Sequence, residues 1–366
     1  MYAENNIVKV AKRDNNPKRK YLVLNTLQGK HMSAEPKEAL KMYKALAEKV
    51  KEGYGGDSVL FVGFAETATA IGTAVAAEFD AFYMQTTREI IPGEEYLYFS
   101  EEHSHATEQK LVRGYLEKNK NQIKHIIFVE DEVTTGKTIL NIVNILKKEF
   151  PDIKSYSVAS LLNGMDESAI LKYQEMNIDL LYLIKTNHAD YDEIVESYKG
   201  DGICHELCTD KPDESIEVTE LNYGDYINPR CGVNSLDYVK HVDNLCSKIL
   251  KKIDIIGMEK ILVMGTEELM YPAIYMGSMI DSAKVYTHST TRSPISPGTE
   301  NDYPIRERYE LRSLYDSDRR TFIYDIGEYD CVIVITDASD NEKMGMFSLI
   351  NALGNKNKKI YIVRWC

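Results

Sequence analysis

Residues 125–138 read HIIFVEDEVTTGKT, and this stretch decides the fold of the first half of the chain. Residues 126–129 form a short uninterrupted apolar run, which is typical of a strand buried on both faces of a parallel sheet. An acidic pair follows, and then a turn rich in hydroxyl groups and glycine. After the turn, apolar residues recur at helical spacing through residue 150. The stretch therefore predicts a strand, a tight turn and a helix in direct succession.

This turn is a candidate phosphate site. At a junction of strand, turn and helix, backbone N–H groups and a helix N-terminus converge, and both attract anions. Gly136 lets an anion approach the backbone, and the threonine hydroxyls of the turn are further donors. Glu130 and Asp131 repel phosphate, but they suit sugar hydroxyls or a phosphate-bound magnesium ion. A Walker loop does not fit, because its first glycine would fall at Asp131.

The segment resembles the phosphoribosyl-pyrophosphate (PRPP) motif of type I phosphoribosyltransferases, in which a strand, two acids and a threonine-glycine turn follow in this order. The resemblance implies that Glu130 and Asp131 hold the ribose hydroxyls, serve as catalytic residues and contact magnesium. It also implies that the loop binds the 5′-phosphate as a substrate-binding segment, through Thr134, Thr135, Gly136, Lys137 and Thr138.

A second junction of this kind lies upstream, where the apolar strand 58–62 runs into the turn GFAET. In the family that the chain resembles, this turn binds pyrophosphate through its backbone, which here assigns Gly63, Phe64, Ala65, Glu66 and Thr67. Glu66 suits either magnesium or a helix cap, and the sequence leaves both open.

The next strand, 82–87, ends in Thr87 and Arg88. Open α/β sheets bind ligands at the carboxyl ends of their strands, and a guanidinium suits pyrophosphate, so we predict Arg88 as a catalytic residue. A surface ion pair is the alternative. Residues 92–110 are polar and without a clear period, and their position matches the flexible catalytic loop of the family. His103 and His105 assist there or are merely solvated.

Composition sets the broad class of the protein. A length of 366 residues predicts two domains, and a net charge of −13 argues against nucleic acid or an anionic membrane as a partner. No apolar run approaches the roughly 18 residues of a membrane span. The first 20 residues lack the apolar core of a signal peptide, and six cysteines without framework spacing suit a reducing cytoplasm. Cys204, His205 and Cys208 resemble half a zinc site, but no second pair follows.

The chain repeats its plan after about residue 235. Gly265 follows Gly63 by 202 residues, Arg292 follows Arg88 by 204, and Asp337 follows Asp131 by 206. Matches in the same order with slowly drifting offsets predict an internal duplication. The second copy lacks the phosphate turn, so we expect Thr291 and Arg292 to bind a different anion or an acceptor. The predicted fold is α/β, with two type I phosphoribosyltransferase-like doubly wound domains, residues 1–234 and a degenerate copy at 235–366.

The chain as a whole resembles the bacterial phosphoribosyltransferase-like proteins of tellurium-resistance and stress gene clusters, which carry a C-terminal TRSP domain. The matching pieces are LNTLQGKH, GFAETAT, TTR, VEDEVTTGKT, NPRCG, THSTTRSP and DRRTFIYD. Glu130 stands where many members of the wider superfamily have aspartate. Some proteins of these clusters carry the name of a cysteine protease.

Three functions follow from these patterns. The leading one is transfer of a phosphoribosyl group between PRPP and an acceptor, in either direction, with magnesium. A non-catalytic regulator that binds PRPP or a nucleotide is the second. The third is a cysteine hydrolase that uses Cys231, because the adjacent Arg230 can favour a thiolate. The expected partner is a small phosphoribosyl or nucleotide substrate, and a homodimer is a further expectation. The acceptor cannot be read from the sequence.

Overall fold

In the computed structural model, the described residues are 2–14, 16, 19–55, 58–100 and 108–366. His103 and His105 therefore lie outside the described residues. The chain forms two compact units, each assembled from separate segments. The first unit consists of Met1–Glu4, Lys41–Asn187 and Ile227–His241, and the second of Asn5–Leu40, His188–Tyr226 and Val242–Cys366.

The first unit is built on a six-stranded sheet in the order β12-β4-β3-β7-β8-β9. All neighbours are parallel except β12, which pairs antiparallel with β4. Residues 60–62 and 126–129 are buried completely, which confirms the prediction that their apolar runs are internal strands. The strands are β3 (Val59–Gly63), β4 (Phe82–Gln85), β7 (His125–Val133), β8 (Ser155–Asn163), β9 (Ile178–Lys185) and β12 (Val233–Asn234).

Helices complete the first unit, together with an antiparallel pair of strands. The helix α5 begins at Lys137, directly after the turn that the sequence predicted, and its apolar positions are buried. The helices are α2 (Pro36–Lys51, from Lys41 onward), α3 (Thr69–Ala77), α4 (Arg113–Asn119), α5 (Lys137–Glu149), α6 (Glu167–Glu175) and the 3-10 turn η1 (Pro229–Cys231).

The sequence suggested that the segment 92–110 lacks regular structure, but the structure contains strands there. It contains two antiparallel strands, β5 (Tyr96–Ser100) and β6 (Glu108–Val112), that flank residues 101–107. In β5, Leu97 and Phe99 are buried while their neighbours are more exposed. This alternation is the period-two pattern of a half-buried strand, and it was present in the sequence.

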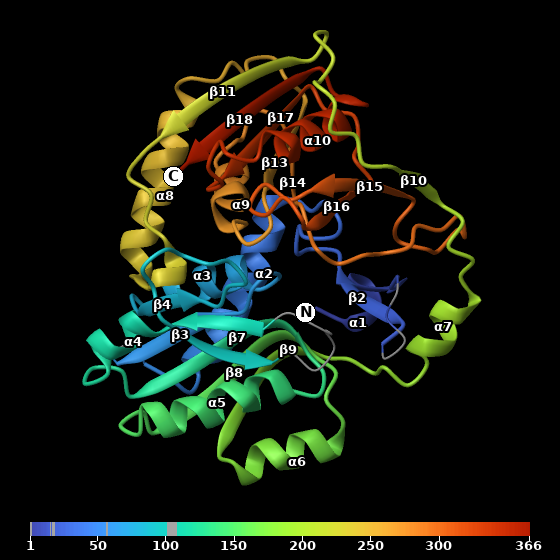
Figure 1. Cartoon of the computed structure of the whole chain (residues 1–366). Helices are drawn as coiled ribbons and strands as arrows, with labels where there is room; N and C mark the ends of the chain where they lie inside the picture. Colours follow the sequence, from blue (N-terminus) through green and yellow to red (C-terminus); the bar gives the residue numbers. More distant parts are fainter. Residues whose placement is uncertain (1, 15, 17–18, 56–57, 101–107) are drawn as a thin grey trace. The chain divides into compact units, whose positions relative to one another are not determined.

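The second unit has a five-stranded, entirely parallel sheet in the order β11-β18-β17-β13-β14. Figure 1 shows β11 beside the red strand β18. A smaller sheet has the order β10-β15-β16. The strands are β10 (Ile203–His205), β11 (Glu217–Tyr223), β13 (Lys260–Gly265), β14 (Lys284–Ser289), β15 (Glu307–Arg312), β16 (Arg320–Tyr324), β17 (Cys331–Thr336) and β18 (Lys359–Trp365).

An antiparallel pair and five helices complete the second unit. The pair is β1 (Val8–Lys12) and β2 (Tyr21–Asn25). The helices are α1 (Glu4–Ile7, from Asn5 onward), α7 (Tyr191–Ser197), α8 (Ser235–Leu250, from Val242 onward), α9 (Tyr271–Ser278) and α10 (Lys343–Gly354). Among the described residues, no helix combines the length and the apolar character needed to cross a membrane.

The two main sheets share one strand plan. The order β4-β3-β7-β8 in the first corresponds to β14-β13-β17-β18 in the second. The register agrees too, because Gly63 pairs with Gln85, and Gly265 pairs with Ser289. Each copy is thus a doubly wound α/β unit, as the repeated spacing predicted. The copies differ at the strand next to β8 or β18: β9 follows β8 in the chain, whereas β11 precedes β18 by more than a hundred residues.

The same hydrogen bond recurs at equivalent positions of the two copies. In the first, the backbone N–H of Ala65 donates to the Thr86 hydroxyl at 2.8 Å. In the second, the N–H of Glu267 donates to the Thr290 hydroxyl at 3.0 Å. A threonine after the second strand therefore holds the turn after the first strand in both copies.

The compact units do not follow a single cut near residue 235. Residues 5–40 and 188–226, which the sequence assigned to the first domain, belong to the second unit. The pairing of β10 with β15 and of β11 with β18 draws residues 188–226 there. The division into 1–234 and 235–366 stays a prediction about the two copies of the duplication.

Candidate active site

The acidic pair lies at the carboxyl end of β7. Glu130 and Asp131 are both partly exposed, and successive residues of a strand point to opposite faces. Asp131 accepts a hydrogen bond from the hydroxyl of Thr67 at 2.8 Å. Burial raises the pKa of Tyr43, and the charge of Asp131 contributes. Burial likewise raises the pKa of Tyr173, with a contribution from Glu130. The two carboxylates therefore have different surroundings.

The turn after the acidic pair requires glycine at one position. Gly136 has a φ of 68°, and a Cβ there would lie 2.4 Å from the Tyr173 hydroxyl oxygen. That hydroxyl donates to the carbonyl of Gly136 at 2.6 Å, which fixes the turn. Tyr173, on α6, was not among the predicted site residues, because nothing in its helical sequence marks it.

The start of α5 has the character of an anion site. Gly136 is its N-cap and supplies no side-chain hydrogen bond to this 13-residue helix, while the N–H of Lys137 donates to the Thr135 hydroxyl at 3.4 Å. The flanking hydroxyls belong to partly exposed residues, and Lys137 is exposed. The helix terminus attracts anions. The partly exposed residues are Thr134, Thr135 and Thr138.

The second predicted turn, residues 63–67, follows the neighbouring strand β3. Its backbone is held from two sides: Thr86 accepts from the N–H of Ala65, and Gln109 donates to the carbonyl of Ala65 at 2.7 Å. The N–H of Phe64 donates to the carbonyl of Val129 at 3.0 Å, which ties the turn to β7. Glu66 is buried within the turn.

Glycine at the start of this turn permits close packing. A Cβ at Gly63 would lie 3.1 Å from the carbonyl oxygen of Ala68 and 3.4 Å from the Cα of Gly72. The strand and α3 therefore approach each other closely. Thr67 completes the turn and contacts the acidic pair through Asp131.

Arg88 follows β4 and is partly buried. The N–H groups of Thr87 and Lys110 each donate to the other residue's carbonyl at 2.9 Å. The Lys110 ammonium also donates to the carbonyl of Arg88 at 2.8 Å. The structure thus places β6 against both predicted segments, and sequence reasoning missed Gln109 and Lys110 because their segment was read as a polar loop.

Thr291 and Arg292 lie in the second unit and belong to a different cluster. Arg292 contacts Glu267 at 2.9 Å and Glu268 at 3.3 Å, and both carboxylates are buried. Arg319 contacts Glu267 as well, at 3.1 Å. The sequence led us to expect an anion of a second substrate beside Arg292. In the structure, the protein's own carboxylates stand beside it.

In the second copy, Asp337 corresponds to Asp131, and its carboxylate is hydrogen-bonded to other side chains of the protein. Asp337 accepts hydrogen bonds from the hydroxyls of Tyr315 at 2.5 Å and Tyr226 at 2.6 Å. The protein's own side chains therefore contact both Asp337 and Arg292.

The thiol of Cys231 lacks the properties of an activated nucleophile. Burial, with a contribution from Glu94, raises its pKa to about 11, and only Arg230 opposes the shift. Such a thiol stays protonated near pH 7, so the neighbouring arginine does not produce the thiolate that the hydrolase hypothesis requires.

Two metal sites were considered from the sequence, half a zinc site at residues 204–208 and a magnesium site at Glu130 and Asp131. Among the described residues, no group of three or more histidine, cysteine or acidic side chains is placed to hold a metal. The half zinc site at residues 204–208 is therefore not completed by other described residues. Glu130 and Asp131 offer carboxylate oxygens, which suit magnesium when substrate phosphates supply further ligands.

Two family models match separate parts of the chain. Residues 7–188 match the family described as phosphoribosyl transferase. Residues 228–353 match the family described as the TRSP domain C-terminal to it. A search of curated proteins found no match.

Several solved structures are similar to part of the chain. Adenine phosphoribosyltransferase from Rhodothermus marinus is 12% identical with a TM-score of 0.37, over 50% of this chain and 96% of that one. The Trypanosoma brucei adenine enzyme, in complex with AMP, pyrophosphate and ribose-5-phosphate, is 14% identical with a TM-score of 0.37, over 49% and 76%. A hypoxanthine phosphoribosyltransferase from Staphylococcus aureus is 15% identical with a TM-score of 0.28, over 42% and 74%.

Proposed function

Because the chain belongs to the family of phosphoribosyl transferases with a C-terminal TRSP domain, we propose that its first unit binds PRPP and transfers the phosphoribosyl group to or from an acceptor. One observation carries this proposal. The acidic pair and the turns 63–67 and 134–138 lie at the carboxyl ends of the neighbouring parallel strands β3 and β7, and Thr67 connects them through Asp131.

Each part of PRPP has a matching segment. The 5′-phosphate binds at the turn 134–138, where α5 begins after the glycine N-cap Gly136 and its N-terminus attracts anions. The ribose hydroxyls donate to Glu130 and Asp131, which lie near the carboxyl end of β7. The pyrophosphate binds the backbone of residues 63–67 and the guanidinium of Arg88.

The donor set fits magnesium. Carboxylate oxygens are preferred ligands, and magnesium is usually bound through one or two carboxylates together with substrate phosphates. Glu130 and Asp131 would hold it, and Glu66 is a further carboxylate, in the turn 63–67. When bound, the ion neutralises charge on the departing pyrophosphate.

The reaction asks mainly for positioning and charge stabilisation. The bond from the ribose C1 to pyrophosphate breaks, with its electron pair leaving on the pyrophosphate, and a bond from C1 to the acceptor forms. The transition state is oxocarbenium-like, so holding the ribose and the leaving group accounts for catalysis without a covalent nucleophile on the protein. The raised pKa of Cys231 agrees with this, since no thiolate is needed.

Two measurements test the proposal. Calorimetry with PRPP should show binding that needs magnesium, and mass spectrometry should show pyrophosphate release when a pool of small-molecule acceptors is added. Cys231→Ser should behave as the wild type in both. A folded protein that does not bind PRPP would contradict the proposal, and binding without turnover of any acceptor would identify a regulator instead. Loss of both activities in Cys231→Ser would favour the hydrolase.

A further inference from the structure

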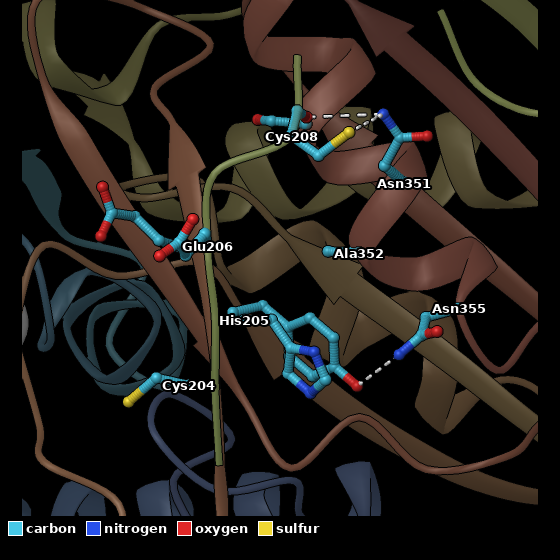
Figure 2. Close-up of a pocket in the computed structure, with 10 residues that line it drawn as sticks. Cys204, His205, Glu206, Cys208, Asn351, Ala352 and Asn355 are labelled. Carbon is cyan, nitrogen blue, oxygen red and sulfur yellow. Dashed lines mark hydrogen bonds between the residues drawn. The ribbon is translucent and has the colours of Figure 1, made fainter. Parts of the chain in front are cut away.

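A cavity of about 440 Å³ lies in the second unit, and none of the residues assigned to the phosphoribosyl site lines it. Its walls are the extended chain from Cys204 to Cys208, the strand β15 and one face of α10 (Figure 2). Small-molecule sites commonly enclose about 300–1,000 Å³. The cavity therefore has the size of a ligand site, and its chemistry can be read from its lining.

The orientation of one lining amide follows from its partners. The side-chain nitrogen of Asn351 donates to the carbonyl oxygens of Asp210 at 2.9 Å and Cys208 at 3.4 Å. Carbonyl oxygens only accept, so the nitrogen must face them (Figure 2). The amide oxygen of Asn351 is consequently left as an acceptor.

A second lining amide is oriented in the same sense. The side-chain nitrogen of Asn355 donates to the hydroxyl oxygen of Tyr309 at 3.2 Å. That hydroxyl donates its own proton to Glu307 at 3.2 Å, so toward Asn355 it is an acceptor. Both asparagines that line the cavity thus use their donors within the protein and keep their acceptor oxygens.

The charges of the lining have one sign. Glu206 is exposed, and Glu310 contacts Arg320 at 3.2 Å, while no lysine or arginine is found among the described residues that line the cavity. His205 stacks on Tyr309 with ring centroids 4.1 Å apart. Its Nε2 atom is buried and makes no hydrogen bond to any described residue. A buried polar atom in this state is costly, and a ligand donor that reached it would relieve the cost.

We propose that this cavity binds a small organic cation rich in N–H donors, such as an amine or a guanidinium compound. Acceptor oxygens and carboxylates match N–H donors, and a cation suits a site whose charged lining is acidic. The same lining repels phosphates, so the ligand differs in class from PRPP and its site is separate from the phosphoribosyl site. The inference does not depend on the proposed transfer activity.

Titration calorimetry of the full chain with spermidine and with agmatine, at low salt, tests this inference. Three variants change the cavity. Ala352→Leu fills its wall, Glu206→Gln removes a charge, and His205→Phe keeps the ring stack but removes the nitrogen. Glu214→Gln is the matched control, because Glu214 is an exposed acid outside the cavity.

We expect saturable one-to-one binding of at least one probe. Ala352→Leu should weaken it about tenfold or more, and the other two cavity variants should weaken it severalfold, since each loses one contact to a cation. Glu214→Gln should bind as the wild type does, and PRPP affinity should stay unchanged in all four variants. No saturable binding of either probe would overturn the inference. Equal binding by the wild type and all cavity variants would also overturn it, because the probes would then bind the acidic surface at large.

Discussion

Thr67 donates its hydroxyl to the carboxylate of Asp131 at 2.8 Å. This contact joins the turn after β3 to the acidic pair near the carboxyl end of β7, so the proposed pyrophosphate and ribose sites are connected by a direct hydrogen bond. A side chain that is held in this way loses less freedom when a substrate binds, and the proposed site is to that extent preorganised.

The acidic pair should dominate PRPP binding. Asp131→Asn keeps the shape of the side chain and an acceptor for Thr67 but removes the charge, and Glu130→Gln does the same on the other face. Each variant should weaken PRPP binding roughly ten- to hundredfold, which corresponds to the loss of charged hydrogen bonds. Calorimetry measures this, with circular dichroism to confirm folding. Asp152→Asn, an exposed acid after α5, is the control, and an unchanged affinity in both site variants would reject the ribose assignment.

Gly136→Ala should damage the phosphate turn. The new Cβ would meet the Tyr173 ring at 2.4–2.7 Å, and the left-handed backbone there disfavours a side chain. We expect the free energy of unfolding in urea to fall by about 1–3 kcal/mol and PRPP binding to weaken. Gly53→Ala is the matched control, since no atom lies within 4 Å of its added carbon. Equal stability of the two variants would show that Tyr173 does not constrain the turn.

Gln109 should act as a positioning residue. Its amide donates to the carbonyl of Ala65 at 2.7 Å while the side chain is buried. Gln109→Leu removes that donor and leaves the turn 63–67 less ordered, so pyrophosphate and PRPP should bind more weakly. Binding of ribose-5-phosphate, which lacks the pyrophosphate, should change little. The exposed Gln122→Leu serves as control. If Gln109→Leu weakened all three ligands equally, a general loss of structure would explain the result better.

The two arginines of the duplicated motif should behave differently. Arg88→Ala should weaken PRPP binding roughly ten- to hundredfold through loss of a charged contact to pyrophosphate. Arg292→Ala should leave PRPP binding almost unchanged, because its guanidinium contacts Glu267 and Glu268. It should instead lower the free energy of unfolding by on the order of 3 kcal/mol, since buried carboxylates lose a partner. PRPP calorimetry and urea denaturation of both variants decide the matter, and equal loss of PRPP binding would refute the distinction.

Two histidines, the buried His288 and the partly exposed His125, should make stability depend on pH. Burial lowers the pKa of His125 and of His288 to about 4. In the unfolded chain the value is about 6.5, so between pH 6.5 and 4 the unfolded state binds more protons. The free energy of unfolding should therefore be unaffected by these groups above pH 6.5 and fall as the pH drops toward 4, by up to roughly 3 kcal/mol for His288. Urea denaturation across this range checks the slope. NMR titration of the imidazole signals would contradict it if both groups titrated near 6.5.

The sequence predicted correctly those elements whose residues follow one another directly along the chain. The apolar run, acidic pair, glycine turn and helix at 125–150 are all local, so their order in the chain is enough to predict β7 and α5. The duplication was readable for the same reason: each copy repeats its strands in order, and the register of Gly63 recurs at Gly265.

Contacts between segments that are far apart along the chain could not be predicted from the sequence. Arg292 follows a strand and two threonines just as Arg88 does, yet the structure gives it buried carboxylates, because a turn that carried Ala65 and Glu66 in one copy carries Glu267 and Glu268 in the other. The role of Gln109 was hidden because its partner lies 44 residues away. The discontinuous units likewise arise from strand pairings of long sequence separation, which local patterns do not encode.

The position of β18 has a consequence for synthesis of the chain. This strand lies inside its sheet, with β17 on one side and β11 on the other, although it is formed by residues 359–365. Strand β11 emerges from the ribosome more than a hundred residues earlier and cannot pair with β18 until that strand is made. The second sheet is therefore expected to close only late in translation, and a chain cut before residue 359 would expose two strand edges at once, each a template for aggregation.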